Sequence, residues 1–392
     1  MTDRPAVPAV NPLLARTDAP PIPEARAWTR RYGGGFGPLV DLSQAAPGTA
    51  PPDALLAKLG EAAATAAAAR YGDIAGDAAL REAIARETAR RYGGTIGADD
   101  VAITAGCNQA FFVAALTVAK AGDAILVPTP WYFNHQTTLE ILGIEPRPLP
   151  CPAATGFIPD VEAAARLCDA RVKAIALVTP NNPTGAIYPQ EVIARFAELC
   201  RARGIWLILD ETYCDFLPAA EQRPHALFGD PAWRDTVIRL YSFSKAYAVP
   251  GHRVGAMIAD GRVVAEIAKV LDNLQICAPR AAQIALAWGV DALGAWREQG
   301  RAEIVERGAA FRRMLNQVPG WRVDSAGAYF AYVRHPFAGE KAQRVAERLA
   351  TERGVLCLPG SFFGPDQEAH LRIAIANVAR DTIAGLAPRF AF

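Results

Sequence analysis

Short apolar runs alternate with helical stretches along most of this 392-residue chain. The apolar runs lie at 101–104, 124–127, 173–179, 205–209, 236–241 and 254–258. Helical stretches such as 189–203 separate most of them. Continuous apolar strands separated by helices are typical of a mostly parallel sheet that is covered on both faces. The pattern therefore predicts an α/β domain in which helices flank a central sheet.

The pattern of proline-rich, helical and apolar stretches divides the chain into two expected domains and a short arm. The predicted segments are a proline-rich N-terminal arm (1–27), the N-terminal part of a small domain (28–49), a large domain (50–280) and a C-terminal small α+β domain (281–392). Within them we expect helices at 52–70, 76–92, 280–316, 338–353 and 379–387, and small-domain strands near 328–333, 355–358 and 371–376. Ligands of such a fold are expected beyond the carboxyl ends of the parallel strands.

Charge and cysteine content exclude several classes of protein. The chain has 41 basic and 40 acidic residues, which argues against a nucleic-acid partner and against attraction to an anionic membrane. Its seven cysteines form no CxxC pair and its five histidines are dispersed, so we expect neither a disulfide framework nor a metal site. No run of 18 apolar residues occurs, so no membrane span is expected. These features predict a reduced, cytoplasmic protein.

Polar and glycine-rich residues cluster in the loops after the predicted strands. Gly106, Cys107 and Asn108 lie between a strand and a helix, where their backbone N–H groups can bind a phosphate. Tyr132, in the aromatic run TPWYFNH, can stack on a flat ligand. Asn182, in PNNPTG, can donate its amide to an anionic oxygen. Taken alone, each motif is also consistent with an ordinary turn or a core aromatic.

A carboxylate and a lysine carry more specific chemistry. Asp210 ends an apolar strand, where it serves either as a helix cap or as the partner of a cationic ring nitrogen. Lys245 is the one lysine of six that lies in a loop rich in serine and tyrosine, and partial desolvation would make it a nucleophile. Ser242 and Ser244, together with Arg253, offer a phosphate site beside it. This combination suits one cofactor, pyridoxal 5'-phosphate.

These motifs also resemble those of a known family. RYGDIAGDAALREAIA, TPWYFNH, PNNPTG, LDETY, SFSK with a following arginine, and LRIAIA occur in the order found in class I and II aminotransferases of pyridoxal-phosphate fold type I. The resemblance runs from about residue 40 to 376. It implies a large domain with a mostly parallel sheet, a smaller α+β domain, and pyridoxal phosphate as cofactor.

The resemblance implies roles for individual residues. Lys245 looks like the lysine that forms the internal aldimine and then moves the proton, and Asp210 like the partner of the pyridine nitrogen, supported from behind by His135. The remaining expected cofactor contacts are Tyr213 and Asn182 at the ring 3-oxygen, Tyr132 on the ring, and Ser242, Arg253, Gly106, Cys107 and Asn108 at the phosphate.

The resemblance also implies a homodimer with composite active sites. Tyr71 matches the tyrosine that reaches the phosphate of the neighbouring subunit, and Arg372 matches the arginine that binds the substrate α-carboxylate. Ala45 stands beside the substrate where the family usually has glycine, so its methyl group is expected to narrow the pocket. No arginine lies in 263–279, where relatives specific for dicarboxylates carry one, which favours neutral or aromatic amino donors unless Arg26, Arg30 or Arg31 supplies the cation.

We therefore predict an aminotransferase that moves an amino group from an amino acid to a 2-oxo acid. One alternative is another enzyme on the same fold and cofactor, such as a C–S β-lyase or a decarboxylase, because fold and cofactor do not determine the reaction. A second is the effector domain of a transcription regulator. That reading needs a DNA-binding module, and fewer than about 50 residues without a basic helix precede the predicted catalytic domain.

Overall fold

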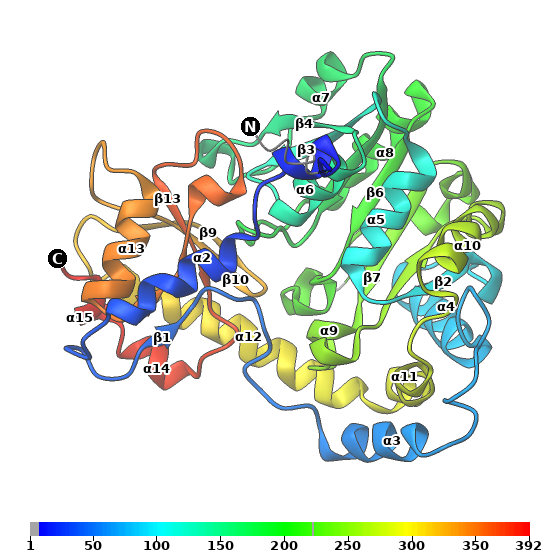
Figure 1. Cartoon of the computed structure of the whole chain (residues 1–392), viewed down its shortest axis with the longest axis horizontal. Coiled ribbons are helices and arrows are strands. Elements are labelled where there is room, and N and C mark those ends of the chain that lie inside the picture. The colour runs from blue at the N-terminus through cyan, green and yellow to red at the C-terminus, as the bar shows by residue number, and fades with distance from the viewer. Residues whose placement is uncertain (1–7, 222) are drawn as a thin grey trace, which may run out of the picture.

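A seven-stranded sheet forms the core of the larger of two lobes in the computed structural model, which describes residues 8–221 and 223–392 (Figure 1). Its strands are β2 (Val101–Thr104), β3 (Ala124–Thr129), β4 (Glu145–Pro150), β5 (Val172–Val178), β6 (Trp206–Asp210), β7 (Val237–Ser242) and β8 (Gly255–Ile258), in the order β2-β8-β7-β6-β5-β3-β4. Only β8 runs antiparallel to its neighbours. The predicted mostly parallel sheet is therefore confirmed.

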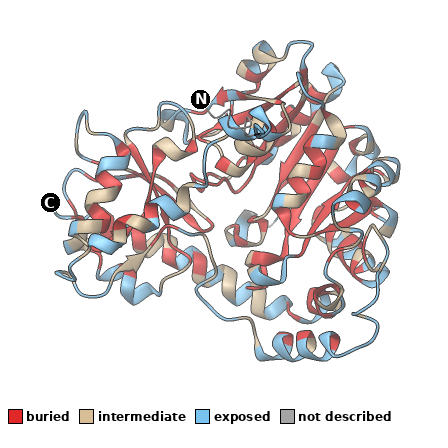
Figure 2. Cartoon of the chain, in the orientation of Figure 1, coloured by how far each residue is buried: buried red, intermediate tan, exposed pale blue. Residues whose placement is uncertain are grey.

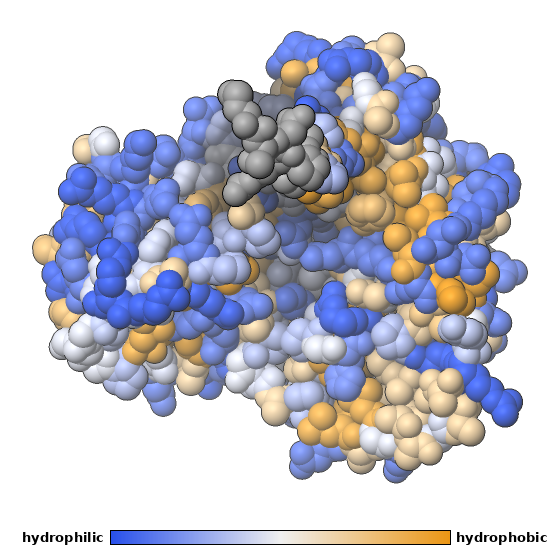
Figure 3. Space-filling view, viewed as in Figure 1, coloured by the Kyte–Doolittle hydropathy of each residue, from blue (hydrophilic) through white to orange (hydrophobic). Residues whose placement is uncertain are grey.

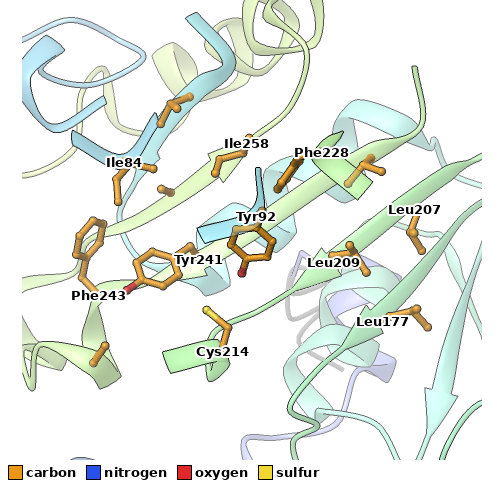
Figure 4. Close-up of a cluster of buried hydrophobic side chains, with 14 of the residues drawn as sticks. Ile84, Tyr92, Leu177, Leu207, Leu209, Cys214, Phe228, Tyr241, Phe243 and Ile258 are labelled. Atoms are coloured by element: carbon orange, nitrogen blue, oxygen red, sulfur yellow. The ribbon is translucent and has the colours of Figure 1, made fainter. Parts of the chain in front are cut away.

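Alternate residues of these strands face two different layers of helices. The large-lobe helices are α3 (Asp53–Ala63), α4 (Ala78–Tyr92), α5 (Cys107–Val118), α6 (Phe133–Ile141), α7 (Val161–Leu167), α8 (Gln190–Arg203), α9 (Phe243–Ala246), α10 (Gly261–Gln275) and α11 (Arg280–Ala292). Side chains of α5, α6 and α10 pack on one face of the sheet, and those of α4, α7, α8 and α11 on the other. Figure 2 shows the sheet buried between them, and Figure 4 shows part of the second layer, where Ile84 and Tyr92 of α4 lie in one cluster with Tyr241 and Leu209 of the sheet. Burial on both faces explains why these strands read as continuous apolar runs.

The smaller lobe is built on an antiparallel sheet. Its elements are α2 (Pro21–Trp28), β1 (Val40–Asp41), β9 (Arg322–Gly327), β10 (Phe330–Arg334), α13 (Ala342–Glu352), β11 (Val355–Leu356), β12 (Leu358–Pro359), β13 (His370–Ala374), α14 (Arg380–Ala384) and α15 (Ala387–Phe390). The order β12-β13-β10-β9 is antiparallel throughout, and β1 pairs in parallel with β11. Residues near 40 and near 355 therefore meet in one small lobe, which α12 (Gly294–Leu315) joins to the large lobe (Figure 1).

Two predicted helices end differently in the structure. The helix predicted over 52–70 stops at Ala63. The alanine-rich segment beyond it forms turns. The Arg280 guanidinium donates to the backbone carbonyl of Ala67 at 2.5 Å, so a tertiary hydrogen bond replaces one within a helix. The single helix predicted over 280–316 is broken at Leu293 into α11 and α12.

The N-terminal arm also differs from expectation where it is described. Residues 1–7 of the predicted arm lie outside the described residues. Beyond them, α1 (Pro12–Arg16) lies against α6, and α2 packs on the small lobe by burying Ala25 and Trp28. Helix α2 is thus packed and not loosely held, because it carries apolar side chains at helical spacing, whereas α1 buries no residue.

Burial also bears on the domain boundary. The side chains of Ala282, Leu286 and Val290 on α11 are buried in the core of the large lobe. We therefore propose that the large domain extends through α11 and that the boundary near 280 belongs inside α12.

In the described part of the chain, no helix has both the length and the apolar character needed to cross a membrane.

Candidate active site

A cavity of about 440 Å³ opens where the carboxyl ends of β5, β6 and β7 meet the first turn of α5. Figure 3 shows the surface hollowed between the two lobes. The described residues that line the cavity are Gln44, Cys107, Asn108, Tyr132, Val178, Asn182, Asp210, Thr212, Tyr213, Ser242, Ser244, Lys245, Pro250 and Arg253. In a parallel sheet the carboxyl ends of neighbouring strands share one edge, so residues far apart in sequence meet here.

Asp210 is a buried carboxylate that is held in its charged form. Its Oδ2 lies 3.1 Å from Nε2 of His135, and its Oδ1 accepts the backbone N–H of Thr212 at 3.0 Å. Burial alone would raise the pKa of Asp210, but the hydrogen bonds from His135 and Thr212 hold it below its ordinary value. His135 is itself fixed by stacking on Phe111, with 3.7 Å between ring centroids. The site therefore presents an anion that suits a cationic ring nitrogen.

Lys245 lies on α9 directly after β7. Its Nζ donates to the backbone carbonyl of Ala45. Burial, together with the nearby charges of Arg372 and Arg253, lowers the pKa of Lys245 to about 8. A lysine with a lowered pKa has more of the neutral amine that attacks a carbonyl carbon.

A phosphate-sized cradle is formed by α5, α9 and Arg253. The Arg253 guanidinium lies 3.4 Å from the Ser244 hydroxyl and donates to the carbonyl of Ala105 at 3.2 Å. Helix α5 begins at Cys107 without a side-chain cap, so its first N–H groups are open to an anion. Gly106 has φ +90°, and a Cβ atom there would lie 2.1 Å from Nη2 of Arg253. Only glycine leaves room for this close approach of helix and guanidinium.

Arg372 is a buried cation without a carboxylate partner among the described residues. It donates to Asn182 Oδ1 at 3.2 Å and to the carbonyl of Ser43, and its Nε has no partner there. Burial lowers the pKa of Arg372 to about 10. A guanidinium left unpaired in this way is a ready site for a carboxylate.

Two tyrosines stand at the cavity wall. The Tyr132 hydroxyl accepts from the Asn134 amide at 2.8 Å and lies 3.4 Å from Asn108 Oδ1. Burial raises the pKa of Tyr132 to about 12 and that of Tyr213 well above its ordinary value. Both hydroxyls therefore keep their protons at neutral pH and can donate hydrogen bonds.

The structure brings most of the predicted site residues together. Gly106 and Arg372 contact residues that line the cavity. Gly106 lies against Arg253, and Arg372 donates a hydrogen bond to Asn182. Ala45 contributes its carbonyl to Lys245 while its side chain packs beside Tyr213 and its aromatic neighbours, so it is not a lining residue. Tyr71 does not line the cavity of its own chain, and its side chain is 78% exposed.

Sequence reasoning did not assign four lining residues to the site. They are Gln44, Val178, Thr212 and Pro250. Each lies within a few residues of an assigned one, so proximity to the motifs could have signalled all four. Gln44, for example, directly precedes Ala45, although its contacts depend on how the small lobe packs.

Comparison with known proteins decides the family. A family model described as aminotransferase class I and II matches residues 38–390. The chain belongs to this family. It is therefore a transaminase of a pyridoxal-phosphate-dependent family, as the motifs predicted.

Individual relatives share the match over most of their length. The arginine–pyruvate transaminase of Pseudomonas aeruginosa is 31% identical over 310 residues, which cover 78% of this chain and 77% of the relative. An aromatic aminotransferase of Arabidopsis thaliana is 26% identical over 358 residues, covering 87% of this chain and 89% of the relative. A double mutant of Thermus thermophilus aspartate aminotransferase superposes with a TM-score of 0.89 at 26% identity, covering 98% and 99% of the two chains.

Proposed function

We propose that this transaminase uses the cavity around Lys245 to move an amino group between an amino acid and a 2-oxo acid on pyridoxal phosphate. The observation that carries the proposal is that Lys245, whose pKa is lowered, and the buried anionic Asp210 line the same cavity. The residues present fit the cofactor: Arg253 and the first turn of α5 suit its phosphate, Asp210 its ring nitrogen and Lys245 its aldehyde. When bound, the cofactor supplies an electron sink for carbon–hydrogen cleavage.

The chain's own residues then position the substrate and move one proton. Arg372 binds the α-carboxylate, with Asn182 fixing the orientation of its guanidinium. Lys245, once its amine is free, takes the proton from the substrate Cα onto its Nζ. It then gives up that proton so that the amino group can leave the substrate carbon skeleton. Asp210 keeps the ring nitrogen cationic, and His135 keeps Asp210 in place.

For the amino donor we propose a neutral or aromatic side chain. The segment 263–279 holds no arginine that could pair with a second carboxylate. Relatives of this chain are named as arginine, valine and aromatic transaminases, so the donor differs within the family. Comparing first half-reaction rates for phenylalanine, methionine, lysine, glutamate and aspartate tests this proposal, and aspartate as the fastest donor would contradict it.

Product stoichiometry separates transamination from the other reactions of this fold. Without an acceptor, the holoenzyme should form one 2-oxo acid per active site and release no ammonia or carbon dioxide. A β-lyase would release ammonia over many turnovers, and a decarboxylase would release carbon dioxide. Multiple turnovers without an acceptor would therefore reject the proposal.

We further propose that the chain works as a homodimer. Besides Tyr71, exposed apolar side chains are found at Leu56 on α3, at Leu274 and Ile276 at the end of α10, and at Ile284 on α11. Figure 3 shows hydrophobic residues gathered over this end of the large lobe. Such a patch is typical of an interface, and a second copy placed there would bring its Tyr71 near a neighbour's cavity.

A reducing compartment, the cytoplasm, suits the cysteines. All seven are free thiols, and Cys107, Cys151, Cys200, Cys214 and Cys357 are buried. Thiol titration of the unfolded protein should find seven reactive groups without prior reduction. Fewer than that would indicate disulfides and contradict this location.

A further inference from the structure

Gln44 and Arg26 form a polar pair at the edge of the active-site cavity. Gln44 lines the cavity, and the Arg26 guanidinium donates to its Oε1 at 2.6 Å. Both side chains are exposed. The neighbours of Gln44 are already engaged, since the Ser43 carbonyl accepts from Arg372 and the Ala45 carbonyl accepts from Lys245. Segment 43–45 thus links the substrate anchor, the catalytic lysine and the Gln44–Arg26 pair.

The chemistry of this pair favours oxygen acceptors. A guanidinium can only donate, so the Gln44 oxygen faces Arg26 and the Gln44 NH₂ group is left for another partner. The Nε and Nη1 atoms of Arg26 have no acceptor among the described residues. The only described carboxylate that lines the cavity is Asp210, which pairs with His135. The edge of the cavity therefore offers several N–H donors and one positive charge without an anion of its own.

The fold fixes Arg26 at this position. Its neighbours on α2, Ala25 and Trp28, are buried in the small lobe and hold the helix in place. The other two arginines considered in the sequence do not serve here, because Arg31 pairs with Glu347 on α13, and neither Arg31 nor Arg30 lines the cavity or contacts a lining residue in the described structure. Of the three, only Arg26 contacts a residue that lines the cavity in the described structure.

We propose that Arg26 and Gln44 bind the distal carboxylate of an acidic 2-oxo acid, which makes the amino acceptor a dicarboxylate. The inference rests on the proposed transamination, in which two substrates enter one cavity in turn. A neutral donor side chain makes no contact with the pair, so the Arg26–Gln44 hydrogen bond stays intact. Because the half-reactions are reversible, the acidic amino acid formed from this acceptor is also expected to act as a donor. An acidic acceptor, anchored at Arg372, instead places its second carboxylate where the free N–H groups can take it. Arg26 and Gln44 are thus specificity-determining residues, outside the proton-transfer machinery.

The test compares two acceptors of the same shape and different charge. 2-Oxoglutarate carries the distal carboxylate, and 5-methyl-2-oxohexanoate replaces it with an apolar branch. For Arg26→Gln we expect kcat/KM with 2-oxoglutarate to fall about tenfold, mainly through KM, because one charge-assisted contact is lost. The value with the apolar acceptor should stay within about twofold. Arg26→Lys should recover part of the loss, and Arg30→Gln is the matched control that should change neither value.

Equilibrium binding gives a second readout that needs no turnover. Calorimetry of the holoenzyme should show glutarate binding about tenfold more weakly to Arg26→Gln than to the unmodified chain, with hexanoate unchanged. Gln44→Met should act in the same direction. Equal losses for both acceptors, or no loss with 2-oxoglutarate, would overturn the inference while leaving transamination intact. Failure of the holoenzyme to convert either acceptor would instead reject the proposed function.

Discussion

At the scale of single residues, three buried charges define the site, and each has a different environment. Asp210 is anionic and paired with His135. Lys245 is desolvated, with its pKa lowered to about 8, and Arg372 has no carboxylate partner among the described residues. Burying an unpaired charge costs folding free energy. A protein can keep unpaired cations in a cavity when the binding of an anionic ligand offsets this loss of folding free energy. The loss can be measured on the protein without its ligands.

The pKa of Lys245 predicts a pH-dependent stability difference. Its value is about 8 in the folded chain, against an ordinary value of 10.5. Below pH 8 both folded and unfolded chains carry the proton, so the folded apoprotein bears the full cost, on the order of 3 kcal/mol. Between pH 8 and 10.5 only the unfolded chain binds the proton, so stability rises with pH.

We therefore expect apo Lys245→Met to unfold at higher denaturant concentration than the unmodified apoprotein at pH 7. The difference should shrink as the pH rises through 8 to 10.5. Lys269→Met, which replaces an exposed lysine on α10, is the matched control and should show no such trend. A gain in Lys245→Met that is constant with pH would show that packing, not the charge, causes it.

Arg372 predicts a loss shared by all substrates. Arg372→Lys keeps the charge and loses the two-pronged geometry that suits a carboxylate. We expect kcat/KM to fall by about 10²-fold for every donor, since a buried charged hydrogen bond contributes about 1.5–3 kcal/mol. Arg334→Lys on the adjacent strand β10, where Arg334 pairs with Asp324, is the control. A loss confined to some donors would place Arg372 at the side chain instead of the α-carboxylate.

At the scale of elements, the cradle depends on the close approach of α5 to β8. Gly255 on β8 pairs with Thr104 of β2, and a Cβ atom on Gly255 would lie 2.8 Å from the Gly106 backbone. Gly106 in turn leaves room for Arg253. The helix terminus and the guanidinium thus occupy positions that only glycine permits, so the phosphate site depends on backbone packing as much as on charged side chains.

Gly106→Ala should weaken cofactor binding more than folding. The new methyl group would lie 2.1 Å from Arg253 Nη2 and displace the guanidinium. We expect pyridoxal phosphate affinity, titrated on the apoprotein, to fall at least about tenfold. Gly122→Ala is a close control, because Gly122 has the same φ of +90° and nothing within 4 Å of its Cβ position. Equal affinity losses in both variants would attribute the effect to backbone strain alone.

At the scale of the whole molecule, the cavity of one chain lacks a residue that the motifs assign to it. Tyr71 is exposed near the apolar side chains of α3 and α11, outside its own cavity. A second copy would cover this surface and complete the site. Dimer formation and catalysis should therefore be coupled.

Hybrid dimers test this coupling. Lys245→Ala chains are mixed with Tyr71→Ala chains under conditions of subunit exchange. If Tyr71 serves the neighbouring site, each hybrid has one site with both defects and one intact site, so activity should return on mixing. If Tyr71 acts in its own chain, both sites keep one defect, and activity stays at the level of the separate variants.

Most of the strands, their order along the chain and the chemistry of the loops could be predicted from the amino-acid sequence. Six strands of the large sheet lie within one or two residues of their predicted ends, because burial on both faces requires unbroken apolar runs. Strand β4 escaped prediction because its sequence, EPRPLP, has no apolar run, and an edge position tolerates its prolines. Strand β9 was also missed.

Which distant residues meet depends on how the elements pack in three dimensions. Asn182 contacts Arg372 across 190 positions, His135 on α6 reaches Asp210 at the end of β6, and Arg26 meets Gln44 where α2 packs on the small lobe. The end of α3 at Ala63 and the break before α12 were likewise set by packing. Local sequence encodes propensity and burial, whereas these contacts depend on how whole elements pack, and no pattern within a short window records that.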